Sequence, residues 1–301
     1  MTFRCKLCGG DRRGRPYALG ARAYRFAAAD CDACGLFQVL YDWSAAPPHG
    51  VTTMHDVASP DWVSDAEMEA HALKATDFAS RLEALGSLSA ASVLDIGCGE
   101  GHFLAACVER GARRVVGQEF RLASIRYARE RCGIADVRSA PLEDVDVWPD
   151  ATFDRVCSFD VIEHVHDLRA YFDQCLRVLK PNGLMFHATP GSDSITHRVG
   201  RLLSRLGAGG PAATLCNVQF VSDMVGGPHV HLMGRRSVGW LSVRENLVVH
   251  AEYVPSYSYS DRHYAAMLPQ LRWLPREIGA RAFGAVRHTI RNKLLFWARR
   301  A

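Results

Sequence analysis

Val93–Leu104, with the sequence VLDIGCGEGHFL, is the stretch that decides the fold. An apolar run leads into three glycines at alternate positions and then into helical spacing, which predicts a buried strand, a tight turn and a helix. The glycines let the backbone turn sharply and leave main-chain N–H groups open to a ligand. A dinucleotide site would need Gly-x-Gly-x-x-Gly, but the third position, counted from Gly97 and Gly99, is His102. The stretch therefore argues against NAD or FAD.

The segments that follow repeat the alternation of strand and helix. An apolar strand ends at Glu119, about 20 residues beyond the turn, which is the spacing that places an acid on a ribose diol. The next expected elements are a helix over 103–110, a strand from 153 that opens into an acidic loop with histidines, a helix over 168–179 and a strand over 184–190. Such alternation predicts an α/β fold with a parallel sheet and a site at the carboxyl ends of its strands.

Taken together, residues 93–104, Glu119, 153–165 and 177–190 resemble the class I S-adenosylmethionine (SAM)-dependent methyltransferases. The resemblance covers roughly residues 90–190 and implies a Rossmann-like sheet with helices on both faces. It implies that SAM is held by Asp95, Gly97 and Gly99 at the methionine part, Glu119 at the ribose, Asp160 in the loop facing the amino group, and Ser139, Ala140 and Leu142 at the adenine. The family often has an acid at the adenine position, where this chain has Ser139.

Two Cys-x-x-Cys pairs occur near the start of the chain. Cys5 and Cys8 form the first, Cys31 and Cys34 the second, and a glycine follows each pair. This spacing predicts one tetrahedral Zn²⁺ bound by four thiolates, a closed shell that is structural rather than catalytic. Reduced cysteines or disulfides are the alternative.

Four parts are expected along the chain. They are a zinc-ribbon module at 1–45, a linker with a helix covering the cofactor at 46–90, a SAM-binding methyltransferase domain at 91–190 and 236–301, and a substrate-cap insertion at 191–235. Residues 276–300 are basic, with apolar positions at rough helical spacing, and predict a helix packed on the domain or on a second subunit, as in a homodimer. A membrane or RNA contact is the alternative for this tail.

Composition limits the classes of partner. The 301 residues are 48% hydrophobic and carry a net charge of +4, which is too small to demand a nucleic-acid partner. There is no run of 18 or more uncharged apolar residues and no signal-peptide core at the start, so we expect a cytoplasmic protein without a transmembrane segment.

Histidines supply the candidates for proton transfer. His229 is the first choice for a general base, His164 the second, and His231 and His166 lie in the same two segments. Each could instead be a hydrogen-bonded structural residue. A divalent ion bound by Glu163, His164 and His231 is a further alternative, although adjacent residues are expected to point in different directions.

These features favour an enzyme that transfers a methyl group from SAM to a small molecule in specialised-metabolite or sugar biosynthesis. Oxygen is the favoured acceptor atom, with nitrogen or carbon possible. One alternative is an rRNA base methyltransferase that recognises RNA through its zinc ribbon, although no Asn-Pro-Pro-Tyr-type motif for a base amine occurs. A second alternative is a non-catalytic scaffold with a methyltransferase fold.

Overall fold

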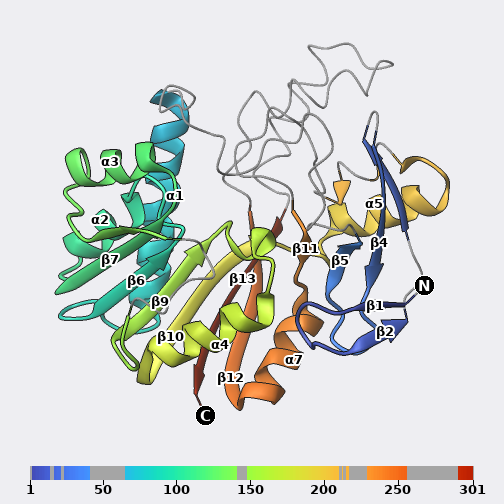
Figure 1. Cartoon of the computed structure of the whole chain (residues 1–301). Coiled ribbons are helices and arrows are strands. Elements are labelled where there is room, and N and C mark those ends of the chain that lie inside the picture. Colours follow the sequence, from blue (N-terminus) through green and yellow to red (C-terminus); the bar gives the residue numbers. More distant parts are fainter. Residues whose placement is uncertain are drawn as a thin grey trace.

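The structure is a computed structural model whose described residues form three sheets (Figure 1). It describes residues 2–13, 17–21, 24–40, 65–140, 148–209, 212, 215–216, 229–255 and 291–300. The linker expected at residues 45–50, where the region 46–90 begins, lies outside the described residues. Among the helices that are described, none is both long and apolar enough to cross a lipid bilayer.

The larger sheet has seven strands in the order β12-β13-β10-β9-β6-β7-β8. Their bounds are β6 (Ser92–Ile96), β7 (Arg114–Glu119), β8 (Val137–Ser139), β9 (Phe153–Phe159), β10 (Leu179–Pro190), β12 (Leu247–Pro255) and β13 (Arg291–Arg300). The five strands from β6 to β10 pair in parallel, and β13 runs antiparallel between β10 and β12. The α/β prediction is confirmed. The chain moves to one side of β6 for β7 and β8 and to the other for β9, so the carboxyl ends of β6 and β9 form the switch point where such sheets bind ligands.

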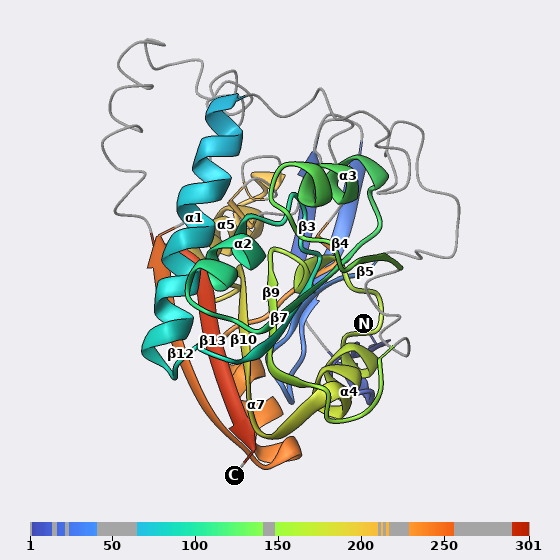
Figure 2. The same cartoon turned by 90° about the vertical axis from the view of Figure 1, so that its left-hand side faces the viewer.

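Helices cover both faces of this sheet (Figures 1 and 2). On one face lie α1 (Asp65–Ala84), α2 (His102–Glu109) and α3 (Leu122–Glu130); on the other lie α4 (Leu168–Val178) and α7 (Arg235–Glu245). Phe78, Phe103 and Ile125 belong to the core of the first face. Helix α4 begins where the Asp167 carboxylate accepts the Ala170 N–H at 3.0 Å, as expected of an N-cap.

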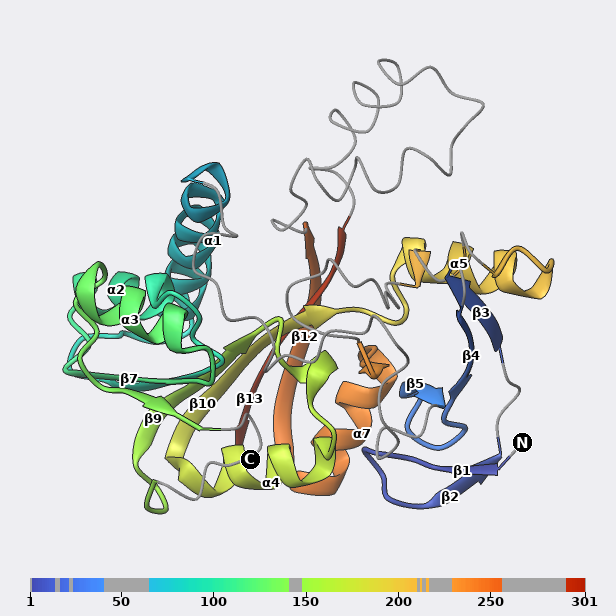
Figure 3. The ribbon, with the colours of Figure 1, turned by 45° about the horizontal axis from the view of Figure 1, so that its top comes forward.

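The N-terminal part forms a smaller antiparallel unit (Figure 3). A hairpin of β1 (Thr2–Arg4) and β2 (Asp11–Arg13) precedes β3 (Tyr17–Ala21), β4 (Tyr24–Asp30) and β5 (Phe37–Leu40). The hairpin is a two-stranded sheet by itself, whereas β3, β4 and β5 belong to a four-stranded sheet. The remaining strand of that sheet is β11 (His231–Leu232), which comes from the far end of the expected cap and pairs with β5. Helix α5 (Ile195–Arg205) lies near the start of the same insertion. The expected cap is thus joined to the N-terminal unit by a strand.

The prediction of a helix over 276–300 is wrong for residues 291–300. These residues form strand β13 in the interior of the larger sheet. Leu294 and Phe296 pack into the core of one face, and Leu295 into the core of the other. A short continuous apolar run fits a strand buried on both faces as well as it fits a helix. Pairing with β10, about a hundred residues earlier, decides between them. This part of the tail is therefore no exposed basic helix for a membrane or RNA.

Replacing Phe296 by alanine tests the interior position of β13. Its side chain is fully buried, with its ring centroid 5.3 Å from that of His187 and 6.3 Å from that of Phe172. We expect Phe296→Ala to lower the free energy of unfolding by about 3 to 4 kcal/mol in a denaturant titration. Leu122→Ala, at a side chain that is 71% exposed, is the control and should change it by about 0.5 kcal/mol or less. Equal, small effects would contradict a buried β13.

Candidate cofactor and catalytic site

The glycine turn follows β6 at the switch point. Gly99 has φ +52° and Gly101 has φ +83°, both in the left-handed region that favours glycine. A Cβ on Gly101 would lie 2.9 Å from Cβ of Ala128, so glycine is also needed there for α3 to pack. The Gly97 and Cys98 N–H groups both donate to the Gln118 carbonyl, at 2.8 and 3.0 Å, which fixes the turn against β7.

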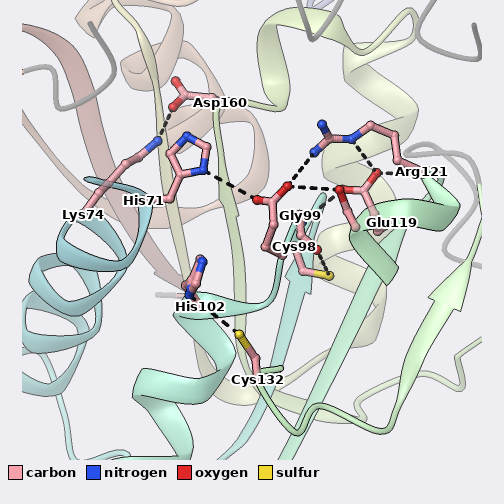
Figure 4. Close-up of polar contacts among 11 residues, drawn as sticks. His71, Lys74, Cys98, Gly99, His102, Glu119, Arg121, Cys132 and Asp160 are labelled. Carbon is pink, nitrogen blue, oxygen red and sulfur yellow. Dashed lines mark hydrogen bonds and ion pairs between the residues drawn. The ribbon is translucent and has the colours of Figure 1, made fainter. Parts of the chain in front are cut away.

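Glu119 ends β7 beside this turn (Figure 4). Its Oε2 accepts the Gly99 N–H at 3.0 Å, and its Oε1 accepts the Phe120 and Arg121 N–H groups at 2.9 Å each. The side chain is buried, and the Arg121 guanidinium lies 3.5 Å from Oε1. The structure thus brings together the acid and the glycine that the sequence paired across 20 residues.

Asp95 lies one residue from the end of β6, and its side chain is buried. Burial, with the nearby charge of Glu119, raises its pKa well above the usual value. Its Oδ1 has no hydrogen-bond partner among the residues that the structure describes. A buried acceptor of this kind needs a donor, and a bound ligand could supply one.

His71 and Lys74 of helix α1 point toward the same site (Figure 4). His71 Nδ1 lies 3.6 Å from Glu100 Oε2, and Lys74 Nζ lies 2.5 Å from Asp160 Oδ2. Burial opposes the ionisation of Glu100, but the contact with His71 and the charge of Arg121 outweigh it and lower its pKa to about 2. These contacts bring two side chains of α1 to the end of the glycine turn and to Asp160. That α1 covers a bound cofactor stays a prediction.

Asp160 follows β9 with φ +59°, in the left-handed region. Its carboxylate contacts two ammonium groups, Lys74 from α1 and Lys293 from β13, and the Lys293 side chain is buried. Burial opposes the ionisation of Asp160, but the two lysines keep its pKa below the usual range. Sequence reasoning missed both lysines. The signal was available at Lys293, a single charge at the start of an apolar run.

A second group of polar side chains lies beyond β9, at η3 (Ile162–His164). One ligand atom each of Glu163, His164 and His229 lies within 4.8 Å of the others, and the two imidazole centroids are 4.8 Å apart. Thr189 Oγ1 donates to Glu163 Oε2 at 2.8 Å, while His229 Nε2 lies 4.0 Å from Glu163 Oε1. Glu163 and His164 therefore do converge, contrary to the expectation for adjacent residues.

His231 lies apart from this group. It is fully buried in β11, and its Nε2–H donates to the Ile162 carbonyl at 2.7 Å. Burial lowers its pKa to about 3, so the imidazole stays neutral. His166 is exposed after η3. Of the three histidines expected to be catalytic, the structure groups His229 and His164, with Glu163.

The expected adenine contacts are described in part. Ser139 ends β8 and is exposed, and Ala140 is buried beside it. Leu142 lies outside the described residues.

The four cysteines of the N-terminal unit lie together. Sγ of Cys5 is 3.5 Å from that of Cys34, Sγ of Cys8 is 3.7 Å from that of Cys31, and all four sulfurs lie within 4.8 Å of one another. Four sulfurs at about 2.3 Å from one tetrahedral Zn²⁺ would be separated by about 3.8 Å, so the donor set fits this ion.

Two matching turns hold these sulfurs. Cys5 N–H donates to Gly10 O and Gly9 N–H to Cys5 O; Cys31 N–H donates to Leu36 O and Gly35 N–H to Cys31 O. The Arg236 guanidinium of α7 donates to the carbonyls of Asp32 and Ala33 in the second turn. The N-terminal unit is thereby attached to the larger domain.

The family of this chain follows from its similarity to known proteins. A family described as "Methyltransferase domain" matches residues 65–252, well over half of the chain. The chain belongs to this methyltransferase family. The match begins at α1 and ends within β12, so it contains the glycine turn, Glu119, Asp160 and the group at η3.

Curated relatives share the central segment. A probable S-adenosylmethionine-dependent methyltransferase of Mycolicibacterium smegmatis is 38% identical over 109 residues, covering 36% of this chain and 41% of the relative. A ubiquinone biosynthesis O-methyltransferase of Bradyrhizobium diazoefficiens is 34% identical over 116 residues, covering 37% and 45%. The chain thus matches less than half the length of each relative.

Solved structures share the fold. An S-adenosylmethionine-dependent methyltransferase from Mesorhizobium loti aligns with a TM-score of 0.50 and 18% identity, over 76% of this chain and all of the other. Magnesium protoporphyrin IX methyltransferase from Synechocystis aligns with a TM-score of 0.50 and 12% identity, over 79% and 89%. At these identities the likeness concerns the fold.

Glu163 makes stability depend on pH. Burial, together with the negative charge of Asp160, raises its pKa to about 8 from the usual 4.5. Between these values the folded protein holds a proton that the unfolded chain has released, so this group's contribution to stability falls as pH rises. Relative to Glu163→Gln, the wild type should lose on the order of 1 kcal/mol for each pH unit from 5 to 8.

Denaturant titrations of both proteins at pH 5, 6, 7 and 8 measure this difference. The glutamine keeps the shape of the side chain and has no proton to lose. A difference between the two proteins that stays constant, or that grows in favour of the wild type with pH, would contradict a protonated Glu163.

Proposed function

We propose that this chain transfers a methyl group from SAM to a small-molecule acceptor, with oxygen favoured over nitrogen or carbon. The observation that carries the proposal is the Glu119 carboxylate on the Gly99 N–H at the switch point. A carboxylate beside bare backbone at the end of the second strand suits a ribose diol. Membership of the methyltransferase family supports the choice of cofactor.

The residues present fit SAM. Gly97 and Gly99 are half-buried at the turn and place no side chain between the backbone and a ligand, while their N–H groups donate to the Gln118 carbonyl and to Glu119 Oε2. Asp95 Oδ1, which has no partner among the described residues, is an acceptor for a ligand donor. Asp160 offers a carboxylate near the position expected for the methionine amino group. Ser139, Ala140 and Leu142 remain the candidates for the adenine. When bound, SAM supplies a methyl group on a positively charged sulfur.

His229 is the proposed general base, with His164 as second choice. During methyl transfer to a hydroxyl, the imidazole would accept the proton that the acceptor oxygen loses. Glu163, 4.0 Å from His229 Nε2, is placed to orient the ring. His231 is assigned a structural part, since its Nε2 is used by the Ile162 carbonyl.

A divalent ion is a second candidate for the same group. Carboxylate and imidazole ligands suit several divalent metals, and Glu163, His164 and His229 converge where the sequence had suggested His231 as the third ligand. An ion there would orient a hydroxylated acceptor and lower the pKa of its hydroxyl.

We also assign a structural Zn²⁺ to Cys5, Cys8, Cys31 and Cys34, supported by the sulfur separations. A ubiquinone O-methyltransferase among the relatives is consistent with oxygen as acceptor atom. An acceptor from specialised or sugar metabolism stays the expectation, and an RNA acceptor or a non-catalytic scaffold stay the alternatives.

Glu119→Gln tests the cofactor site. Glutamine has a single acceptor oxygen and brings an NH₂ group toward three backbone N–H donors, so it cannot both cap the turn and accept from a ribose. We expect SAM affinity, measured by calorimetry, to fall by about tenfold or more. Glu130→Gln, at an exposed glutamate of α3, is the matched control and should bind like wild type. Unchanged affinity in Glu119→Gln would remove the assignment.

His229→Asn tests the base. Transfer from radiolabelled SAM to panels of phenols, sugars and RNA first identifies an acceptor. With that acceptor, the variant should lose about 100-fold or more in kcat and keep SAM affinity. His166→Asn, an exposed neighbour of η3, is the control.

Added Mg²⁺ separates the two candidate mechanisms. Turnover that rises with Mg²⁺ in wild type and not in His229→Asn favours the ion. If His229→Asn transferred methyl groups at the wild-type rate without added metal, both the general-base mechanism and the metal mechanism would be contradicted.

A further inference from the structure

Strand β11 belongs to two parts of the molecule at once. It is the fourth strand of the four-stranded N-terminal sheet, and it begins two residues after His229 in the chain. Its backbone therefore connects the cysteine unit to the proposed base.

On its site side, this segment is hydrogen-bonded to η3. Val230 N–H donates to the Glu163 carbonyl at 2.9 Å, and His231 Nε2–H donates to the Ile162 carbonyl at 2.7 Å. Val230 and His231 are buried at 1% and 0% exposure. Two hydrogen bonds from consecutive residues thus hold His229 against the loop that carries Glu163 and His164.

On its other side, the segment pairs with β5. Val39 N–H donates to the Val230 carbonyl at 3.0 Å, and the register sets His231 opposite Gln38. Both backbone groups of Val230 are thereby used, one by β5 and one by η3. A shift of β5 would move Val230 relative to Glu163.

Gln38 links β5 to the first cysteine turn. Its Oε1 accepts the Lys6 N–H at 3.0 Å, and its Nε2 donates to the Arg4 carbonyl at 3.1 Å. These two backbone groups flank Cys5. With 5% of its side chain exposed, Gln38 has no access to bulk water as a substitute partner.

The packing is continuous along this path. Leu7 and Leu36 of the cysteine turns share one buried cluster with Ile162 and Val165 at η3. A close-packed interior transmits a displacement rather than absorbing it.

We propose that the metal-binding N-terminal unit positions the active-site histidine, and that Gln38 is the positioning residue that couples the cysteine turn through β5 and β11 to His229. The proposal rests on the proposed function in one respect, that His229 is the reacting group.

Gln38→Met is the test variant, because methionine has a similar length and makes neither hydrogen bond. Arg236→Met is the matched control, because it removes the contact of α7 with the second cysteine turn and leaves the Gln38 path intact. Hydrogen exchange and the ¹H–¹³C signal of His229 Cε1, assigned by its absence in His229→Asn, are recorded on the full zinc-loaded chain. SAM affinity is measured on the same samples.

In Gln38→Met we expect amide exchange over residues 229–233 to become at least tenfold faster, the His229 signal to shift, and SAM affinity to stay within twofold of wild type. Exchange in β6 should not change. Arg236→Met should leave 229–233 and the His229 signal as in wild type. Faster exchange confined to residues 2–10 would overturn the proposal, since Gln38 would then serve the cysteine turn alone.

A second measurement covers the case in which Gln38→Met fails to fold. Wild-type protein stripped of thiolate-bound metal by a chelator, and then reloaded with Zn²⁺, should show the same rise over 229–233 and its reversal. No change over 229–233 on metal removal would also overturn the proposal. Hydrogen exchange and the His229 signal do not depend on methyl transfer. A failure of the proposed function would therefore appear in the SAM titration and the turnover assay, and a failure of this proposal would appear in the exchange data.

Discussion

The Glu119 carboxylate on the Gly99 N–H ties the end of β7 to the turn after β6, and the rest of the site is arranged around this contact. The glycines are required because the turn places Gly99 and Gly101 at positive φ. Helix α1 then lies where His71 and Lys74 reach Glu100 and Asp160. The sheet order, which reverses at β6, brings the segment after β9 to the same edge.

Several charged side chains lie at this edge of the sheet, and Asp160 is stabilised there by ion pairs with Lys74 and Lys293. Lys293 is buried with its ammonium group on Asp160, and a buried ion in such a place is tolerated only when its partner stays with it. Burial and the negative charge of Asp160 raise the pKa of Glu163, three residues further on, to about 8, so this carboxyl keeps its proton. Two carboxyl groups on one loop are thus held in opposite states of ionisation, as is common where groups act on protons.

Much of the fold was predictable, because local spacing determined it. The turn at 93–104, Glu119 and helix α4 are encoded within short windows, and the structure has them where the sequence suggested. Strand β13 was not predictable, because its apolar run suits helix and strand equally and its partner β10 is distant in the chain. Three further contacts were not predictable for the same reason: the ion pair of Lys293 with Asp160 and the pairing of β11 with β5. The third is the hydrogen bond of the buried His231 to the Ile162 carbonyl in η3. Contacts between distant segments decided each of these.

The most direct test of the account is a calorimetric titration of the wild-type chain with SAM and with S-adenosylhomocysteine, with bound zinc measured on the same sample. The account predicts micromolar binding of one ligand molecule per chain, and about one zinc per chain as four thiolates require. A folded, zinc-loaded chain that binds neither ligand would contradict it and would point to a scaffold that keeps the methyltransferase fold without its cofactor.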